Sequence, residues 1–384
     1  MNLGKVIIHS SHDLLLIVSQ GQPRMIPERG KLIKRFLPFM LAGLLVIILY
    51  VYFFVDIYEM ITFLRKANPL YYSLAVVALL LDTLFFSLTW HYFLDRLSIK
   101  APFRKTFLFV WAATFVDILI PAESITGDIS RAYLMSRETG ETEQNTGKIA
   151  ASLISHRILV SVVVLSSLVI SCLFLILGYE IPVQPVLGMS ISNWIILVTL
   201  GTVIILLFLF ALALKEEITR RIMNSLFKVV VFLSKGRWQL TGLKSRAQKA
   251  LDAFHYAIKV FREHPSSLTG PTVFALLSWL FSLLLSSLVF LSLGHPIHFG
   301  IVMVVHSLSC AIQSIPLGIP AEMGLTEVAM ISLYAAFLSG IPGVGALSAA
   351  ATFLIRILTV GLRLFIGFVA IQWIGAKGLT AAVR

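Results

Sequence analysis

The stretch PAESITGD, residues 121–128, decides how this chain folds, because it places two acids and two helix breakers at the end of an apolar run. Residues 106–120 before it are largely apolar, whereas DISRAYLMSRETGETEQN, residues 128–145, is too polar to cross hydrocarbon. The apolar run must therefore turn back to the side it came from, as a re-entrant helical hairpin. Non-helical backbone at membrane depth is tolerated only where it is buried in protein or lines a wet cavity.

The same motif returns as PAEMGLTE at residues 320–327, an offset of 199 residues. Both copies keep Pro-Ala-Glu and place a second acid seven residues after the proline. The same offset aligns Arg157 with Arg356 and carries the apolar run 71–94 onto 270–293. Chance similarity between apolar segments is the alternative, but the identities fall on Pro, Glu and Arg. The sequence therefore predicts two internal repeats.

The composition is that of a polytopic membrane protein, with 58% hydrophobic and 13% charged residues. The runs are continuous and lack the alternation of an outer-membrane barrel, so the predicted fold class is all-α. Each span needs about 20 helical residues. We expect spans at roughly 36–55, 71–94, 148–177, 192–214, 271–293 and 344–374, with shorter apolar runs at 106–120 and 299–319.

The net charge of +12 lies mainly between the spans, which favours an anionic cytoplasmic leaflet over nucleic acid as the partner. The positive loops place both termini in the cytoplasm of a cell-membrane protein. The first repeat then begins outside at residue 71 and the second inside at residue 270, so the repeats are inverted. Inverted repeats with broken helices are typical of secondary transporters.

The predicted organisation is a single transmembrane domain over residues 36–376 between a cytoplasmic segment, 1–35, and a cytoplasmic tail, 377–384. Within it we expect repeat one at 71–177, a basic cytoplasmic segment at 215–270 and repeat two at 270–376. Apolar residues recur at helical spacing in the basic segment, at Leu243, Ala247, Leu251, Phe254, Ile258 and Phe261. That helix either lies on anionic lipid or packs on the protein.

The candidate substrate-binding residues are the motif acids and the arginines near them: Glu123, Asp128, Arg131, Arg157, Glu322, Glu327 and Arg356. Charge in a membrane costs about 2.5–3.5 kcal/mol per residue, so these groups must pair or meet water. In one interpretation the arginines receive an anionic head group. In the other, acid–arginine pairs only lock each hairpin to its neighbouring helix, and Asp128 and Glu327 act as acids at helix N-termini.

Other polar residues are interpreted separately. Asp82 is expected to line the polar interior and Asp117 to contact its own hairpin, while Arg363 either reaches the interface or joins the site. Cys172 and Cys310 lie in apolar segments and indicate neither a disulfide nor a metal site. The chain shows no nucleotide-binding glycine loop and no histidine pair at metal-binding spacing. We therefore expect no cofactor, no metal and no catalytic residues.

PAESITGDISRAYL resembles the first signature of the lysylphosphatidylglycerol synthase transmembrane family, a proline followed by Gly-acid-x-x-Arg. PLGIPAEMGLTE resembles its second signature, and HRIL at 156–159 and IRIL at 355–358 resemble its arginine positions. The resemblance covers about residues 36–376. This family is similar to the flippase half of the multiple peptide resistance factor. Asp128 stands where Glu is common, and Pro-Ala-Glu replaces a glycine-rich approach in the second motif.

The resemblance implies that Asp128, Arg131, Arg157, Glu327 and Arg356 handle lipid. We expect a flippase-like transporter, not an enzyme, that moves a phospholipid or a polyprenyl-phosphate-linked lipid between leaflets. We expect no aminoacyltransferase half and therefore no synthase activity. The alternatives are a transporter of a small organic anion and an intramembrane enzyme acting on a lipid phosphate. A glycosyltransferase or lipid-modifying enzyme is the expected protein partner.

Overall fold

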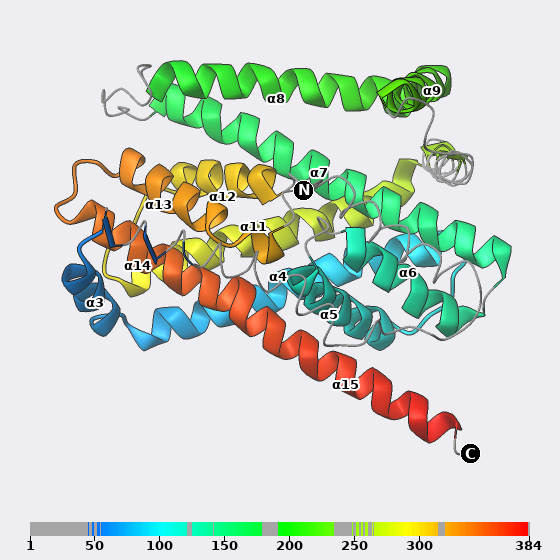
Figure 1. Ribbon diagram of the computed structural model, residues 1–384, viewed down its shortest axis with the longest axis horizontal. Coiled ribbons are helices and arrows are strands. Elements are labelled where there is room, and N and C mark those ends of the chain that lie inside the picture. The colour runs from blue at the N-terminus through cyan, green and yellow to red at the C-terminus, as the bar shows by residue number, and fades with distance from the viewer. Residues whose placement is uncertain are drawn as a thin grey trace.

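The computed structural model is helical, with no strand among the residues that it describes (Figure 1). It describes residues 55–120, 125–140, 142–178, 191–233, 265–313 and 319–382, with isolated positions between 45 and 53 and between 248 and 263. Most of the predicted span 36–55, most of the apolar face within 215–270, and Glu123 lie outside the described residues. The all-helical prediction is confirmed for the rest.

The described residues form a succession of helices along the chain. The α-helices are α3 (Ile57–Arg65), α4 (Pro69–Arg96), α5 (Phe103–Leu119), α6 (Ile125–Thr139), α7 (Glu143–Gly178), α8 (Ile191–Leu214), α9 (Glu216–Leu233), α11 (Thr269–Ser292), α12 (Phe299–Gln313), α13 (Leu325–Phe337), α14 (Val344–Arg356) and α15 (Arg363–Ala382). Short 3₁₀ turns occupy η1 (Pro265–Leu268) and η2 (Pro320–Glu322), and a π-helical segment, η3 (Ile357–Leu362), joins α14 to α15.

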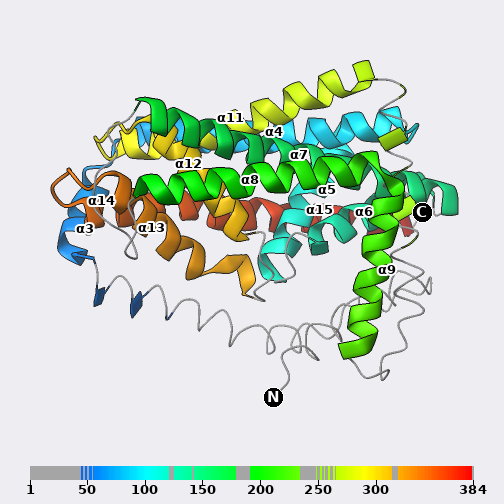
Figure 2. The same ribbon diagram turned by 90° about the horizontal axis from the view of Figure 1, so that it is seen from above.

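The helices α4 and α11, here called the central pair, make the most extensive helix–helix contact of the bundle and lie side by side along one edge of it in Figure 2. They run in opposite directions, because the backbone N–H of Asn68, just before α4, donates to the carbonyl of Ser292 at the end of α11 (2.6 Å). Asn68 also caps α4, accepting from the N–H of Leu70 at 2.9 Å, and Pro69 suits the first helical position. The predicted spans 71–94 and 271–293 are these two helices.

Two helical hairpins flank the central pair. In the first, formed by α5 and α6, the Nζ of Lys105 lies 2.5 Å from Glu138 Oε2, so the hairpin starts and ends at the same end of the bundle. In the second, formed by α12 and α13, the end of α13 returns to the end of α11, just before α12 begins. There the ring centroids of Tyr334 and Phe290 lie 4.7 Å apart. The predicted apolar runs 106–120 and 299–319 correspond to α5 and to α12, of which the structure describes Phe299–Gln313.

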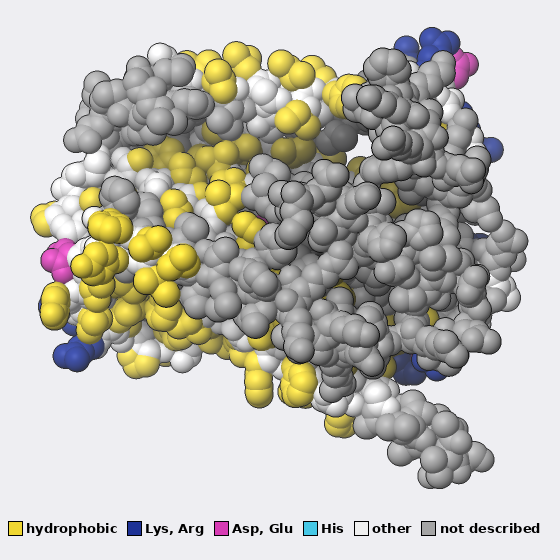
Figure 3. All heavy atoms as spheres, in the orientation of Figure 1, with side chains coloured by type: hydrophobic (Ala, Val, Ile, Leu, Met, Phe, Trp, Pro, Cys, Tyr) yellow, Lys and Arg dark blue, Asp and Glu magenta, His cyan; other side chains and the backbone are white. Residues whose placement is uncertain are grey.

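Many large apolar side chains are exposed on the described helices, and on the face drawn in Figure 3 they gather over its left part and along its upper edge. Four of the described helical stretches are long and apolar enough to cross a membrane: Pro69–Arg96, Asn145–Leu173, Thr269–Ser292 and Val344–Gly375. The 24-residue α8, which carries no charged residue, packs on α7 and exposes Leu200, Ile204 and Leu207. Such a surface is stable in hydrocarbon and insoluble in water, which supports a multi-pass membrane protein.

Hydroxyl groups inside the apolar helices bond to their own backbone. Thr83 donates to the carbonyl of Leu79 at 3.1 Å, and Ser87 donates to the carbonyl of Thr83 at 2.7 Å. This pattern satisfies the hydrogen-bonding groups of small polar side chains within one helix, without a partner helix. Charged side chains cannot be satisfied in this way, so their contacts must come from tertiary structure.

Candidate functional site

Asp128, Arg131 and Arg157 form a charged cluster, here called the first cluster, between α6 and α7. Asp128 lies in the first turn of α6 and its two carboxylate oxygens accept from different arginines. Oδ1 accepts from Arg131 Nη2, and Oδ2 accepts from Arg157 Nη2 at 2.8 Å. The Arg131 side chain is buried, whereas 45% of the Arg157 side chain is exposed. The carboxylate therefore links a buried arginine to an accessible one.

Arg131 is held from three further sides. Its guanidinium lies over the rings of Phe86 (5.5 Å) and Trp90 (5.1 Å) of α4, a cation–π arrangement. Its Nη1 lies 3.3 Å from Nδ1 of the buried His156 on α7. Because α4, α6 and α7 all contact this side chain, Arg131 fixes the first hairpin on the rest of the bundle.

The turn of the first hairpin is organised by Asp117, near the end of α5. Its Oδ1 accepts from Thr126 Oγ1 at 2.7 Å and from the backbone N–H of Gly127 at 2.6 Å. A Cβ atom on residue 127 would overlap this carboxylate, so glycine allows the carboxylate to lie in this position. The predicted hairpin contact of Asp117 is confirmed, and it explains the glycine in the motif.

Glu327 and Arg356 form the second cluster, between α13 and α14. Arg356 Nε donates to Glu327 Oε1 at 2.5 Å, and its Nη2 donates to the carbonyl of Ala321 at 2.7 Å. Glu327 Oε2 accepts from the N–H of Gly324 at 2.7 Å, which caps α13. The pairs Asp128–Arg157 and Glu327–Arg356 both join residues 29 positions apart.

The backbone before α13 is strained where it meets Arg356. Ala321 and Glu322 have φ of 51° and 48°, in the left-handed region that residues with a Cβ adopt at a cost. Gly324 follows with φ 92°. Such strain persists only where surrounding contacts enforce it, and it concentrates at functional sites. Here Arg356 supplies that contact by bonding to Ala321 and to Glu327.

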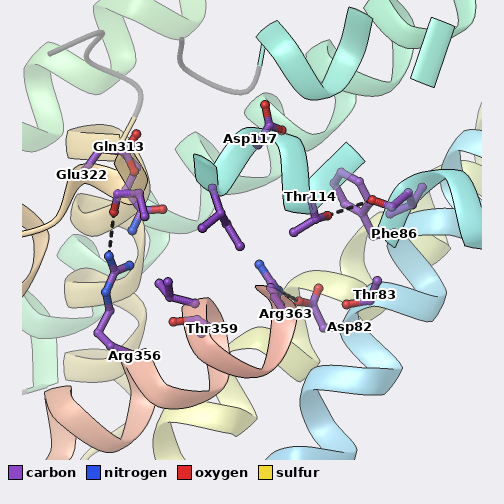
Figure 4. A pocket seen from close by; sticks show the side chains of 14 residues that line it. Asp82, Thr83, Phe86, Thr114, Asp117, Gln313, Glu322, Arg356, Thr359 and Arg363 are labelled. Carbon is purple, nitrogen blue, oxygen red and sulfur yellow. Dashed lines mark hydrogen bonds and ion pairs between the residues drawn. The ribbon is translucent and has the colours of Figure 1, made fainter. Parts of the chain in front are cut away.

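A polar cavity of about 230 Å³ opens between the two hairpins and the central helices (Figure 4). Two arginines and three acids line it among the described residues, together with threonines and a glutamine. Its lining comes from α4 (Asp82, Thr83, Phe86), α5 (Val110, Thr114, Asp117, Ile118), α12 (Gln313), η2 (Ala321, Glu322), α14 (Arg356), η3 (Thr359, Val360) and α15 (Arg363). This many charges inside an apolar bundle require a polar occupant or one another.

Asp82 and Arg363 form an ion pair in the wall of this cavity (Figure 4). Arg363 Nη2 lies 2.5 Å from Asp82 Oδ2, and Ser278 Oγ of α11 donates to Asp82 Oδ1 at 2.6 Å. The prediction that Asp82 lines the polar interior is confirmed by these contacts, and of the two alternatives for Arg363 they favour the one in which it joins the polar residues.

The helix carrying both cavity arginines is widened between them. Arg356, Thr359, Val360 and Arg363 follow an i, i+3, i+4, i+7 pattern and all line the cavity. The π-helical turn η3 lies between the two arginines. Such turns are rare and occur frequently at functional sites.

The structure divides the predicted site residues between two places. Glu322 and Arg356 line the cavity, with Glu327 behind Arg356. Asp128, Arg131 and Arg157 form the first cluster, which adjoins the cavity through Phe86 and through Asp117 at the neighbouring turn. Glu123 lies outside the described residues. The ion pairs agree with the interpretation that acids lock the hairpins; contact with a substrate stays a prediction.

The motif search did not select Asp82, Asp117 and Arg363 as site residues, because none has a counterpart of its kind at the 199-residue offset. The available signal was their charge inside an apolar run. Among the described residues, no group of His, Cys, Asp and Glu could hold a metal ion.

The sequence of this chain is similar to those of known membrane proteins. The family model of the lysylphosphatidylglycerol synthase TM region matches residues 40–367. A UPF0104 membrane protein of Methanothermobacter thermautotrophicus is 25% identical over 82% of this chain and 88% of its own length. UPF0104 membrane proteins of Pyrococcus horikoshii (79% of this chain, 87% of its own) and Methanocaldococcus jannaschii (83% and 88%) are each 24% identical. No solved structure matches this chain.

Proposed function

The chain belongs to the family of the lysylphosphatidylglycerol synthase TM region, and we propose that it is a flippase-like lipid transporter. Its substrate would be a phospholipid or a polyprenyl-phosphate-linked lipid. The cavity carries this proposal, because it places five charged side chains inside a bundle with an apolar exterior. A lipid presents the matching combination of a charged head and apolar tails.

The arrangement of the helices supports two inverted repeats. The helix pairs α4 and α11, α5 and α12, and α6 and α13 begin within a few residues of the 199-residue offset. Antiparallel α4 and α11 are the arrangement that inversion requires. The hairpin helices have 13 to 17 residues, so each is about 20–26 Å long and shorter than a bilayer core. These lengths favour re-entrant hairpins that meet near the midplane.

The contacts divide the roles of the charged groups. Arg356 and Arg363 line the cavity and are placed to attract a phosphate. Half-exposed Arg157 in the first cluster offers a further contact for an anion. Asp128 and Glu327 each bond to an arginine, so their proposed role is to set the geometry of these arginines. The tails would remain in hydrocarbon while the head group crosses through the cavity.

Reconstitution tests this function directly. Purified protein is placed in vesicles containing a trace of fluorescent phosphatidylglycerol, phosphatidylethanolamine or polyprenyl phosphate, and movement is followed by quenching the outer leaflet. We expect faster movement of at least one lipid than in empty vesicles. If none of these lipids moves faster, lipid transport is contradicted.

A cavity-filling variant tests whether lipid passes through the cavity. Thr359→Leu adds bulk to its wall without removing a charge, and should slow movement about tenfold, equivalent to about 1.4 kcal/mol. Thr62→Leu on exposed α3 is the matched control and should leave the rate unchanged. Equal rates in the two variants would place the route elsewhere.

A further inference from the structure

The pair Asp82–Arg363 differs from the two hairpin pairs because it occurs once. Asp128–Arg157 and Glu327–Arg356 correspond at the 199-residue offset, which suits a structural task shared by both halves. The positions corresponding to Asp82 and Arg363 are Phe281 and Val164. An ion pair inside the cavity without an equivalent in the other half needs a separate explanation.

Arg363 is less completely bonded than Arg356. Arg356 donates through Nε and Nη2 to two acceptors, a carboxylate and a carbonyl. Arg363 bonds to Asp82 through Nη2, and its buried Nε has no hydrogen-bond partner among the described residues. A buried donor left unmatched costs about 1–3 kcal/mol. Arg363 therefore has capacity for another acceptor at Nε, whereas Nε of Arg356 already bonds to Glu327.

Asp82 is surrounded by groups that bond to its carboxylate or interact with its charge. Arg363 of α15 and Ser278 of α11 bond to its two oxygens. His306 and Cys310 of α12 interact electrostatically with it, and His306 Nε2 lies 3.1 Å from Ser282 Oγ, one turn after Ser278. Three further charged groups face the same cavity: Asp117 of α5, Glu322 of η2 and Arg356 of α14.

We propose that Asp82 binds a proton together with the anionic head group, so that the transporter carries both across the membrane. This proposal rests on the proposed function. Ionised Asp82 and a lipid phosphate compete for the same guanidinium. A proton on Asp82 removes the competitor and leaves Arg363 to donate to the phosphate. Proton and anion then bind cooperatively, and each raises the affinity for the other by the same factor.

Joint binding also lowers the cost of crossing the membrane. With Asp82 ionised, Arg363 is neutralised and an added phosphate brings an uncompensated negative charge into the cavity. With Asp82 protonated, the phosphate replaces the carboxylate as the partner of Arg363, and the net charge of this site is unchanged. Because uncompensated charge in a low-dielectric interior is expensive, the proton-loaded form is the better carrier of an anion.

The test is the binding of dihexanoylphosphatidylglycerol, a short-chain anionic lipid, to the purified full-length protein in a neutral detergent. Its phosphodiester is a strong acid and stays singly charged around neutral pH, so a pH dependence of binding would come from the protein. The affinity should fall as pH rises, by up to about tenfold per pH unit where Asp82 is ionised in the free protein. In weakly buffered solution with a pH indicator, the protein should take up as much as one proton for each lipid that it binds.

Asp82→Asn identifies the proton-binding group. The variant keeps the shape of Asp82 and resembles its protonated form, so it should bind the lipid with little dependence on pH and without proton uptake. Asp252→Asn, which removes the exposed partner of Arg220, is the matched control and should retain the wild-type pH dependence.

The outcomes separate this inference from the proposed function. Lipid binding or transport by wild type without pH dependence and proton uptake overturns the proton coupling and leaves lipid transport standing. Wild-type behaviour in Asp82→Asn moves the proton to another group, such as His306, and also overturns the assignment. The proton-uptake measurement on wild type decides the coupling even when the variant does not fold. Failure to bind or move any lipid overturns both proposals.

Discussion

At the scale of the residue, Arg356 stabilises the second hairpin through its ion pair with Glu327 and its hydrogen bond to the carbonyl of Ala321. Its side chain and that of Glu327 are 12% and 10% exposed. Removing one member of such a buried pair leaves an uncompensated charge, which is more costly than losing the pair as a whole. The surface pair Lys105–Glu138, with exposures of 41% and 29%, is screened by water and contributes much less.

Arg356→Gln should therefore lower the free energy of unfolding by about 3–5 kcal/mol, because Glu327 stays buried without its partner. Lys105→Gln, the matched control, should cost about 0–1 kcal/mol. Unfolding in detergent, followed by circular dichroism, measures both. The double variant Glu327→Gln with Arg356→Gln should lose less than the sum of the single changes. Equal costs for Arg356→Gln and Lys105→Gln would contradict this account.

At the scale of the element, the position of α15 depends on close contact with α5. Gly367 lies one turn after Arg363, and a Cβ there would stand 2.6 Å from the carbonyl oxygen of Trp111 and 2.8 Å from Phe115 Cβ. Glycine thus brings the backbones of α5 and α15 together, and this approach places Arg363 opposite Asp82. Gly375, later in the same helix, has nothing within 4 Å of such an atom.

Gly367→Ala should push α15 away from α5 and destabilise the protein by about 1–3 kcal/mol, as overpacking does. Gly375→Ala should be neutral or stabilising by up to about 1 kcal/mol, since alanine favours helix. Thermal unfolding in detergent compares the two variants. Stabilisation by Gly367→Ala would show that the α5–α15 contact can relax without cost.

At the scale of the whole molecule, the two ends of the bundle differ in charge. Arg96, Lys100 and Lys105 lie at the end where α4 finishes and α5 begins. The opposite end carries Arg65 and Lys66 before the start of α4, but its connections 294–298 and 338–343 contain no lysine or arginine (Figure 1). By the positive-inside rule, we propose that the first end faces the cytoplasm.

Cysteine labelling tests this orientation. In a background with Cys172 and Cys310 replaced by alanine, Gly340→Cys should react with a membrane-impermeant maleimide in intact cells. Lys100→Cys should react only after the membrane is permeabilised. Both positions are exposed in the structure, so access to the reagent differs only through the membrane. The reverse pattern would invert the topology and the direction assigned to both hairpins.

The sequence by itself determined the helical fold class, the membrane setting, the family resemblance and the bounds of most helices. These properties depend on local composition, on runs of apolar residues and on helix breakers, all of which are legible along the chain. The 199-residue repeat also predicted that Asp128 and Glu327 would occupy equivalent first-turn positions. Pairing of these acids with Arg157 and Arg356 was one of two alternatives that the cost of unpaired charge in hydrocarbon left open.

Only the tertiary structure decided which charges share the cavity. Asp82 and Arg363 are 281 residues apart, and they meet because α15 crosses α5 at Gly367 and approaches α4. The same packing separates the first cluster from Arg356, although the motifs look alike in sequence. Long-range pairing depends on how helices pack, and helix packing depends on shape complementarity between distant faces, which no local pattern encodes.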